Sequence, residues 1–309
     1  MTKRIAALDL GTNLFHILIA DISSQAEINP ILKKDFMVQI GEGGMSAKQI
    51  LPAAYQRGLT TMRDIHQLVT TYKVDTVLGC ATSAIRDAEN GKAFIKEVFQ
   101  QTGIHIDIIQ GRKEAELIHQ GVIGGADLSE DKELLLIDIG GGSVELILSK
   151  GGNIIWLDSL QLGAARLAEK FPVPDPIQGS YFPPLTSYIH SVLSQLPEYL
   201  LTQDSLSWIG VNGAFETLSH MIADKQVKGQ AFPHRFQFDL ETYQKAAGEL
   251  YVATREERAQ FPGMVPVRID NIILACAVIE VLAEILPPNM IQVSQYALLE
   301  GLIFEQFND

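Results

Sequence analysis

The sequence predicts an α/β protein made of two related lobes, and three observations support this prediction. The chain has 309 residues, which is enough for two domains of ordinary size. Short runs of apolar and β-branched residues alternate along it with segments of helical periodicity. A strand–Asp–turn–strand pattern occurs twice, because residues 5–20 match residues 134–149 when Asp9 is placed on Asp138, 129 positions later. Lobes built around these copies would aim two similar turns at one ligand in a cleft, unless the match of two short patterns is a coincidence.

The second copy, LLLIDIGGGSVELILS, has the clearer chemistry. Apolar runs on both sides of a glycine turn indicate a β-hairpin. The turn consists of Gly140, Gly141, Gly142 and Ser143. Glycine permits a positive φ and the close approach of a ligand. Successive N–H groups in such a turn can surround an anion, to which Ser143 adds a hydroxyl group. The alternative is an ordinary flexible turn.

This turn differs from the common nucleotide-binding loops, because its glycines lead into a strand and no Gly-Lys-Ser/Thr follows. Asp138 and Glu145 flank it. One of these carboxylates could hold a divalent metal ion, and the other could hold a metal or orient a water molecule. The first copy, IAALDLGTNLFHILIA, has Gly11, Thr12 and Asn13 where the second copy has its three glycines.

The first half of the chain continues with strands and helices in alternation. A glycine-rich loop at residues 41–44 is either a mobile surface turn or a loop at the edge of a substrate site. A helix is predicted over residues 53–72, because Leu59, Met62, Ile65 and Val69 share one face. The expected strands are residues 5–9, 15–22, 31–40, 74–80 and 104–109, and the other expected helices are residues 94–102 and 111–121.

Two charged residues in this half are candidates for the site. Arg86 lies just past a buried strand, where an arginine is well placed to bind an anion. The alternative is a structural pair with Asp87, Glu89 or another carboxylate. Glu114 lies in the first turn of the helix predicted from residue 111, where a carboxylate is expected for capping and dipole reasons alone.

A polar segment at residues 124–132 separates the two halves. Further on, Gly213 follows a short strand and precedes a helix, which is the commonest shape of a phosphate loop and equally an ordinary turn. Asp270 or Asn271 is the expected N-cap of a long apolar helix ending near residue 285. The other expected strands are residues 154–160, 207–211 and 290–293, and the other helices are residues 162–167, 185–201, 215–223, 239–255 and 298–307.

Composition argues against several classes of protein. The net charge of −13 disfavours broad binding to nucleic acid or to an anionic membrane, so an anionic substrate would need local cations, a metal ion or backbone N–H donors. No apolar run reaches the roughly 18 residues of a membrane span. The N-terminus lacks the features of a signal peptide. Cys80 and Cys276 lie far apart in apolar runs, which favours buried thiols over a disulfide. We therefore expect a cytoplasmic protein.

Eight motifs occur in order along the chain: AALDLGTNLF, ATSAIRDAEN, GRKEAEL, LLIDIGGGSVEL, LGAARL, GVNGAFETL, VRIDNIILACAVI and VSQYALLEGLI. Together they resemble the exopolyphosphatase and guanosine pentaphosphate phosphohydrolase family, within the superfamily of acetate and sugar kinases, heat-shock proteins and actin. The resemblance implies two actin-like (ribonuclease H-like) lobes around a central cleft. Lobe I would comprise residues 1–125, joined by the C-terminal helix at residues 297–309, and lobe II would comprise residues 126–296.

The resemblance also implies a reaction. Terminal phosphate would be released from inorganic polyphosphate, or from guanosine pentaphosphate of the stringent response, by in-line attack of an activated water. Mg²⁺ or Mn²⁺ would be the cofactor, a homodimer would be compatible with the family, and no nucleic-acid or membrane partner is implied.

The family's functional residues can be placed on this sequence. Glu114 matches the catalytic glutamate and would act as general base. Asp138 and Glu145 match the family's Asp-x-Gly-Gly-Gly-Ser-x-Glu motif and would handle metal and water, with Glu145 also catalytic and Asp9 a further candidate metal ligand. The implied phosphate-binding residues are Gly11, Thr12, Asn13, Arg86, Gly140, Gly141, Gly142, Ser143 and Gly213.

The chain departs from the family pattern at several positions. Glu116 and Leu299 stand where the family has arginine, Leu14 where it often has serine, and Ala214 where it often has threonine. Loss of two cations weakens the case for a cationic track for long polyphosphate. Longer members carry an extra C-terminal helical domain, whereas this chain stops at Asp309, so we expect a weaker processive grip on a long polymer.

Two alternative functions remain open. One is a small-molecule kinase or ATPase of the same superfamily, which would need an adenosine pocket near residues 210–214. The other is a non-catalytic protein that binds guanosine alarmones, which the missing arginines favour.

Overall fold

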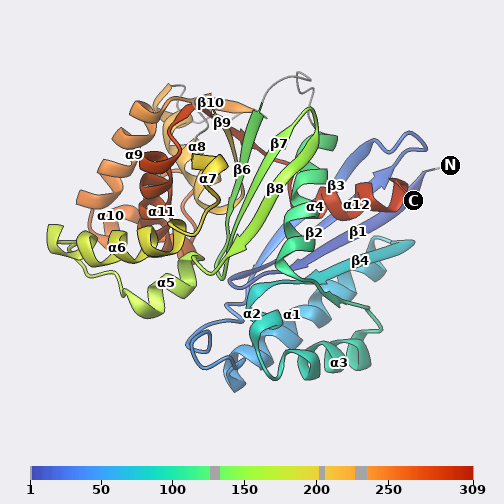
Figure 1. Ribbon diagram of the computed structural model, residues 1–309. Coiled ribbons are helices and arrows are strands. Elements are labelled where there is room, and N and C mark those ends of the chain that lie inside the picture. The colour runs from blue at the N-terminus through green and yellow to red at the C-terminus, as the bar shows by residue number, and fades with distance from the viewer. Residues whose placement is uncertain (1, 126–132, 202–205, 227–234, 309) are drawn as a thin grey trace. The chain divides into compact units, whose positions relative to one another are not determined.

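The computed structural model describes residues 2–125, 133–201, 206–226 and 235–308 (Figure 1). The chain divides into two compact units. Unit 1 comprises Met1–Asp127 and Tyr296–Asp309, and unit 2 comprises Leu128–Gln295. Most of the polar segment predicted to separate the two halves, residues 126–132, lies outside the described residues. Within the described ranges, no helix combines the length and apolar character needed to cross a bilayer.

Unit 1 is built on a five-stranded mixed sheet in the order β3-β2-β1-β4-β5. The first three strands are antiparallel neighbours, and β4 and β5 run parallel to β1. The strands are β1 (Lys3–Leu10), β2 (Leu14–Ile22), β3 (Ile28–Met37), β4 (Thr76–Ala81) and β5 (Asp107–Ile108). The helices are α1 (Pro52–Thr71), α2 (Ser83–Asp87), α3 (Gly91–Thr102), α4 (Gly111–Gly124) and α12 (Leu298–Asn308).

Unit 2 is built on a six-stranded mixed sheet in the order β10-β11-β9-β6-β7-β8. The strands are β6 (Glu133–Ile139), β7 (Val144–Lys150), β8 (Asn153–Leu160), β9 (Leu206–Val211), β10 (Phe236–Phe238) and β11 (Pro288–Ser294). The helices are α5 (Ala164–Lys170), α6 (Phe182–Leu193), α7 (Glu198–Leu201), α8 (Gly213–Gln226), α9 (Leu240–Val252), α10 (Arg255–Arg258) and α11 (Asn271–Ile285).

The two sheets share one topology, which confirms the predicted fold class. In each, three antiparallel strands are followed by two strands parallel to the first, and β10 adds an edge strand in unit 2. The hairpins also share one register, because Asp9 lies opposite His16 in unit 1 and Asp138 lies opposite Glu145 in unit 2. The repeat in the sequence is therefore a repeated ribonuclease H-like unit.

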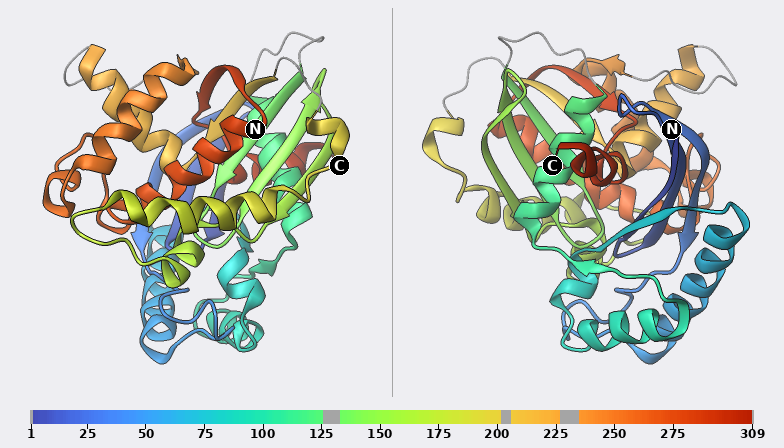
Figure 2. Two further views of the ribbon diagram at one scale, coloured as in Figure 1. Left: turned by 60° about the vertical axis from the view of Figure 1, so that its left-hand side comes forward. Right: turned by 90° about the vertical axis from the view of Figure 1, so that its right-hand side faces the viewer.

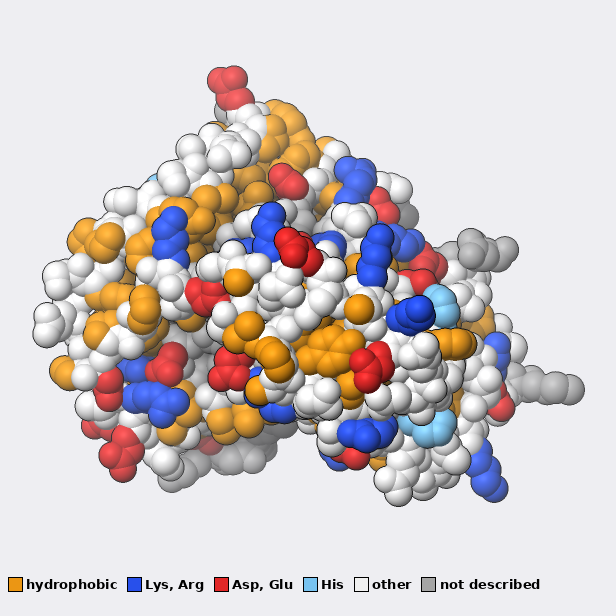
Figure 3. Space-filling view, turned by 90° about the horizontal axis from the view of Figure 1, so that it is seen from below, with side chains coloured by type: hydrophobic (Ala, Val, Ile, Leu, Met, Phe, Trp, Pro, Cys, Tyr) orange, Lys and Arg blue, Asp and Glu red, His pale blue; other side chains and the backbone are white. Residues whose placement is uncertain are grey.

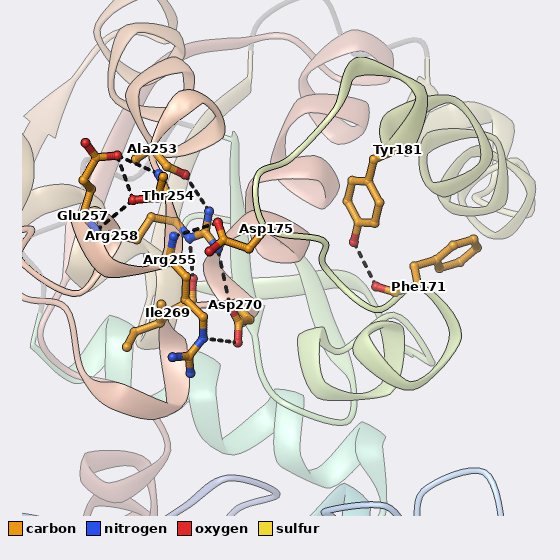
Figure 4. Close-up of polar contacts among 10 residues, drawn as sticks. All are labelled: Phe171, Asp175, Tyr181, Ala253, Thr254, Arg255, Glu257, Arg258, Ile269 and Asp270. Atoms are coloured by element: carbon orange, nitrogen blue, oxygen red, sulfur yellow. Dashed lines mark hydrogen bonds and ion pairs between the residues drawn. The ribbon is translucent and has the colours of Figure 1, made fainter.

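Helix α11 forms the centre of the core of unit 2. Its residues from Ile272 to Ala283 are almost all buried, because the segment is apolar on every side. The expected side-chain cap is not made: Asp270 occupies the N-cap position without a capping bond. Its carboxylate instead accepts from the fully buried Arg258, which also donates to the carbonyls of Ile269 and Ala253, as Figure 4 shows. This network ties the segment after α9 to the start of α11.

Helices α4 and α12 of unit 1 cross at two glycines (Figure 2). A Cβ atom added to Gly121 would lie 1.9 Å from the carbonyl oxygen of Ala297, and one added to Gly301 would lie 1.9 Å from that of Leu117. The two backbones therefore touch directly. Helix α4 also carries Glu114 in its first turn.

Several local predictions differ from the structure. The strand expected at residues 104–109 pairs only at Asp107–Ile108, and Ile104 and Ile106 are buried in the core ahead of it. The loop at residues 41–44 packs against the first turn, since the Gly41 N–H donates to the Thr12 carbonyl and Gly41 is buried. The helix expected at residues 239–255 ends at Val252, and the short strand β10 was not foreseen.

The glycine contact between α4 and α12 generates a paired prediction. Gly301→Ala should lower the free energy of unfolding by about 1–3 kcal/mol, because the new methyl group meets backbone that cannot move aside. Gly248→Ala, in the interior of α9 with nothing within 4 Å of its Cβ, should raise it by about 0.5–1 kcal/mol. Urea unfolding of both variants checks the signs, and equal effects would contradict the packing described.

Buried His119 on α4 generates a pH prediction. Burial lowers the pKa of His119 from 6.5 to about 4, so between these pH values the unfolded chain binds a proton that the native state excludes. Its contribution to stability is present above pH 6.5 and is lost as pH falls towards 4. His119→Gln should therefore lose less stability than wild type between pH 7 and 4, by on the order of 2 kcal/mol. Urea unfolding across this range tests it, and identical pH profiles would refute it.

Candidate functional site

The hairpin β6–β7 places two predicted site residues side by side. Asp138 is the next-to-last residue of β6, and Glu145 lies directly opposite it on β7. Residues directly opposite in a sheet point to the same face. Both carboxylates are buried, and each has a partner that orients it. The amide of Asn212 donates to Oδ2 of Asp138 at 2.9 Å, and the hydroxyl of Ser159 donates to Oε1 of Glu145 at 2.7 Å.

The turn between these strands has its carbonyls held by the start of α5. The N–H of Ala164 donates to the Gly140 carbonyl at 2.9 Å. The N–H groups of Ala165 and Arg166 both donate to the Gly141 carbonyl. The room for this contact comes from Gly163, where a Cβ atom would lie 2.3 Å from the carbonyl carbon of Gly142. The segment from residue 163 to 166 therefore holds the turn through its backbone.

This arrangement leaves the opposite face of the turn with hydrogen-bond donors. Among the described residues, no hydrogen bond takes the N–H of Gly141, Gly142 or Ser143 to a protein acceptor. Successive N–H groups of this kind form a site for an anion such as a phosphate group. None of the three glycines adopts a positive φ, so the turn does not depend on a left-handed conformation.

Left-handed backbone occurs instead between β9 and α8. Asn212 has φ of 55° and Gly213 has φ of 41°. This double left-handed turn brings the Asn212 amide onto Asp138 and starts α8 at Gly213. A Cβ atom at Gly213 would lie 3.1 Å from the Ile139 carbonyl, so the turn packs tightly behind the hairpin. Gly213, predicted as a phosphate contact, therefore lies next to the other unit 2 candidates.

The first turn in unit 1 repeats this geometry with different supports. The N–H of Gly11 donates to the Leu14 carbonyl at 3.1 Å, as that of Gly140 donates to the Ser143 carbonyl at 3.0 Å. The Thr12 and Asn13 carbonyls accept from backbone N–H groups of residues 38–41. In the described part of the chain, the N–H groups of Thr12 and Asn13 have no protein acceptor.

Asp9 precedes this turn with a buried oxygen and no partner for it. Within the described residues, Oδ1 of Asp9 makes no hydrogen bond. Burial raises the pKa of Asp9 to about 6, while the nearby His16 opposes and Asp35 adds to this shift. A buried carboxylate oxygen without a donor is suited to a cation. The residue opposite Asp9, at the position that Glu145 has in unit 2, is His16. Nδ1 of His16 lies 2.7 Å from Oδ1 of Asp35.

Glu114 and Arg86, both candidates in unit 1, form a buried ion pair. Nη1 of Arg86 donates to Oε2 of Glu114 at 2.8 Å and to the Ile109 carbonyl at 3.1 Å. Their side chains are 9% and 10% exposed, and Arg86 also lies 3.8 Å from Asp87. The structure thus contains the carboxylate partner that the sequence left open for Arg86. Such a pair fixes the orientation of the Glu114 carboxylate.

The donor set of unit 2 fits a hard divalent cation in part. Mg²⁺ is commonly held by one or two carboxylates, with water and substrate phosphate completing its shell. Asp138 and Glu145 supply two such groups on one face, and Asn212 and Ser159 orient them. Over the described ranges, no three His, Cys, Asp or Glu side chains group closely enough to bind a metal by themselves. The protein would therefore rely on water and substrate oxygens as further ligands.

The positions that depart from the family pattern have plain structural roles. Leu299 is buried in an apolar cluster with residues of β1 and β2, so its side chain belongs to the core of unit 1. Glu116 pairs with the exposed Arg112, one helical turn earlier. On the face drawn in Figure 3, basic and acidic side chains are interspersed rather than separated.

Three supporting residues went unrecognised in the sequence: Asn212, Ser159 and Arg166. Asn212 had a usable signal, since a short polar residue after a buried strand tolerates left-handed backbone. Ser159 could be found only from the register of β7 with β8, because its partner lies 14 residues away. Arg166 lies in the LGAARL motif, but its partner is a backbone carbonyl that no sequence pattern reveals.

Relatives of known name match nearly the whole chain. Exopolyphosphatase 2 of Mycobacterium tuberculosis is 27% identical over 311 residues, covering 97% of each sequence. The crystal structure of an exopolyphosphatase from Cytophaga hutchinsonii is 31% identical, with a TM-score of 0.94 and coverage of 99% of this chain and 98% of that one.

A nucleotide-hydrolysing relative matches as well. Guanosine-5'-triphosphate,3'-diphosphate pyrophosphatase of Aeromonas salmonicida is 24% identical over 300 residues, which cover 97% of this chain and 58% of that protein. Residues 18–309 match the sequence pattern of the Ppx/GppA phosphatase family, so the chain belongs to that family.

Proposed function

We propose that this protein is a metal-dependent phosphohydrolase that releases the terminal phosphate of inorganic polyphosphate or guanosine pentaphosphate. The observation that carries the proposal is the turn at residues 140–143. The N–H groups of Gly141, Gly142 and Ser143 have no acceptor among the described residues, and Asp138 and Glu145 pair across the hairpin that the turn closes. This combination of anion donors and hard oxygen ligands suits a phosphoryl group with a divalent cation. The same activities appear in the names of relatives.

In the proposed mechanism, the turns hold the phosphate chain through backbone N–H groups. The Gly141, Gly142 and Ser143 amides of unit 2 would bind phosphate oxygens, and the Thr12 and Asn13 amides give unit 1 donors of the same kind. These dipoles are fixed before the substrate arrives, so charge developing on the equatorial oxygens is stabilised without reorganisation. Such preorganised positioning supplies most of the catalysis in phosphoryl transfer.

Glu114 is the proposed general base. It would accept a proton from a water molecule lined up with the terminal phosphorus. Arg86 would keep the carboxylate in one orientation through its contact with Oε2. When bound at Asp138 and Glu145, Mg²⁺ would neutralise charge on the phosphate oxygens. Asn212 and Ser159 would hold those two carboxylates in place.

Polyphosphate is the substrate we favour. The two exopolyphosphatase relatives align over almost their full length, whereas the guanosine-nucleotide relative aligns over 58% of its length. Recognition by backbone N–H groups also suits a simple phosphate chain. With a net charge of −13 and Leu299 in the core, we expect short polyphosphate to be used better than long polymer.

The direct test is phosphate release with Mg²⁺ from long polyphosphate, short polyphosphate and guanosine pentaphosphate. Glu114→Gln should lower the rate by about a hundredfold or more, because it removes the base but keeps the shape. The matched control is Glu97→Gln on α3, where a carboxylate accepts from Tyr55, and it should stay near the wild-type rate. A wild-type rate in Glu114→Gln would exclude this residue as the base. No release from any substrate by folded wild type would refute the proposed function.

Metal dependence gives a second test. A chelator should stop phosphate release, and added Mg²⁺ should restore it. Asp138→Asn should raise the Mg²⁺ concentration needed for half-maximal rate by about tenfold or more, because it removes one anionic ligand. Asp64→Asn, at an exposed position on α1, should leave this concentration unchanged. Titration of rate against Mg²⁺ measures both, and an unaltered requirement in Asp138→Asn would remove this residue from the metal site.

A further inference from the structure

We propose that Arg166 is a positioning residue for the turn at residues 140–143, and that its hydrogen bond to a backbone carbonyl aims the Ser143 N–H at the phosphate. The inference rests on the proposed function of this turn. The role is to support the backbone of the turn rather than to bind phosphate, since Nε of Arg166 donates to the Gly142 carbonyl.

The observation is that the carbonyls of Gly140, Gly141 and Gly142 all accept hydrogen bonds from residues 164–166. The Gly140 and Gly141 carbonyls accept from N–H groups at the start of α5. The Gly142 carbonyl has no backbone donor among the described residues, and Nε of Arg166 donates to it at 2.8 Å. Arg166 therefore completes with its side chain what the first turn of α5 does with its backbone.

The geometry of the peptide bond turns this contact into an effect on the opposite face. In a trans peptide, the carbonyl of one residue and the N–H of the next point in opposite directions. The only cis peptide in the described residues is Asp175–Pro176, so the peptide between Gly142 and Ser143 is trans. Holding the Gly142 carbonyl towards α5 therefore directs the Ser143 N–H away from α5.

This peptide needs external support for two reasons. Glycine has no Cβ, so little in Gly141 or Gly142 resists rotation of the peptide plane. In addition, the usual bond of a two-residue hairpin turn, from the Ser143 N–H to the Gly140 carbonyl, is replaced, since that carbonyl accepts from Ala164. Without Arg166, the Gly142 peptide would be the least restrained part of the turn.

Unit 1 supports its turn in the same way, one peptide further back. Nε of Arg57 on α1 donates to the Val38 carbonyl at 2.8 Å. The N–H of the same peptide, that of Gln39, donates to the Asn13 carbonyl at 2.8 Å. The Leu14 N–H is thereby directed away from this support. An arginine Nε thus supports each of the two related turns, directly in unit 2 and through the peptide between Val38 and Gln39 in unit 1.

The experiment separates a hydrogen-bond role from a charge role by three substitutions at one position. Arg166→Gln places an N–H donor at the same distance along the side chain as Nε but removes the charge. Arg166→Lys keeps the charge but has no donor at that atom. Arg166→Met keeps the length and has neither. Arg255→Met, at a half-exposed arginine paired with Asp270 in the same unit, controls for loss of an ion pair.

The readouts are kcat, KM and melting temperature with short polyphosphate and Mg²⁺. We expect Arg166→Gln to stay within about threefold of wild type in kcat/KM. In Arg166→Lys and Arg166→Met, kcat/KM should fall by about tenfold or more. This loss is smaller than the loss seen when an oxyanion donor is removed outright, because the Ser143 N–H is still present. Melting temperatures should drop by only about 2–4 °C, as expected for one hydrogen bond. Arg255→Met should match wild type in kcat/KM.

Other outcomes overturn the inference. Activity retained in Arg166→Lys but lost in Arg166→Gln would show that the charge acts on the phosphate. Equal activity, or equal loss, in all three variants would also refute a role for the Nε hydrogen bond. A second readout does not need turnover: the backbone amide NMR signals of Gly142 and Ser143 should shift in Arg166→Met and Arg166→Lys but not in Arg166→Gln. If wild type releases no phosphate, the proposed function fails and these signals alone decide the inference.

Discussion

The structure depends on the direction of a few peptide planes. A backbone N–H can face a ligand only if the carbonyl of the same peptide is satisfied on the other side, because an unpaired buried carbonyl costs free energy. The second turn meets this condition at Gly140, Gly141 and Gly142, whose carbonyls accept from residues 164–166. In the first turn, the Thr12 and Asn13 carbonyls accept from N–H groups of residues 38–41. Anion binding by neutral backbone dipoles is one way for a protein of net charge −13 to hold a phosphate chain. The support behind each turn is therefore as important as the turn.

Hydrogen bonds from neighbouring side chains also orient the carboxylates of the candidate site. Asp138 accepts from the Asn212 amide and Glu145 accepts from the Ser159 hydroxyl, and both contacts orient the carboxylates. Glu114 is instead paired with Arg86, and that pair is almost fully buried. Buried charges are costly unless paired or bound to a metal. The printed contacts of Asp138 and Glu145 are to neutral side chains, whereas Glu114 is held by the charged Arg86.

The two units share a topology but not a chemistry. At the position where unit 2 has Glu145 opposite Asp138, unit 1 has His16 opposite Asp9, and His16 pairs with Asp35. One hairpin thus presents two carboxylates and the other presents one carboxylate beside an imidazole. The supports differ as well, since a loop braces the first turn and a helix start braces the second. The two copies of the fold therefore present different side chains next to their turns.

By itself, the sequence determined the fold class, the repeat centred on Asp9 and Asp138, and the carboxylates and glycines of the candidate site. These are local features, because hydrophobic periodicity and turn composition act over a few residues. Only the tertiary structure decided that Arg86 pairs with Glu114, that Leu299 lies in the core, and that Asp270 binds arginines rather than capping α11. It alone showed Arg166 on the Gly142 carbonyl. Such contacts join residues distant in sequence, and a backbone carbonyl is chemically the same at every position, so only its placement in space selects the partner.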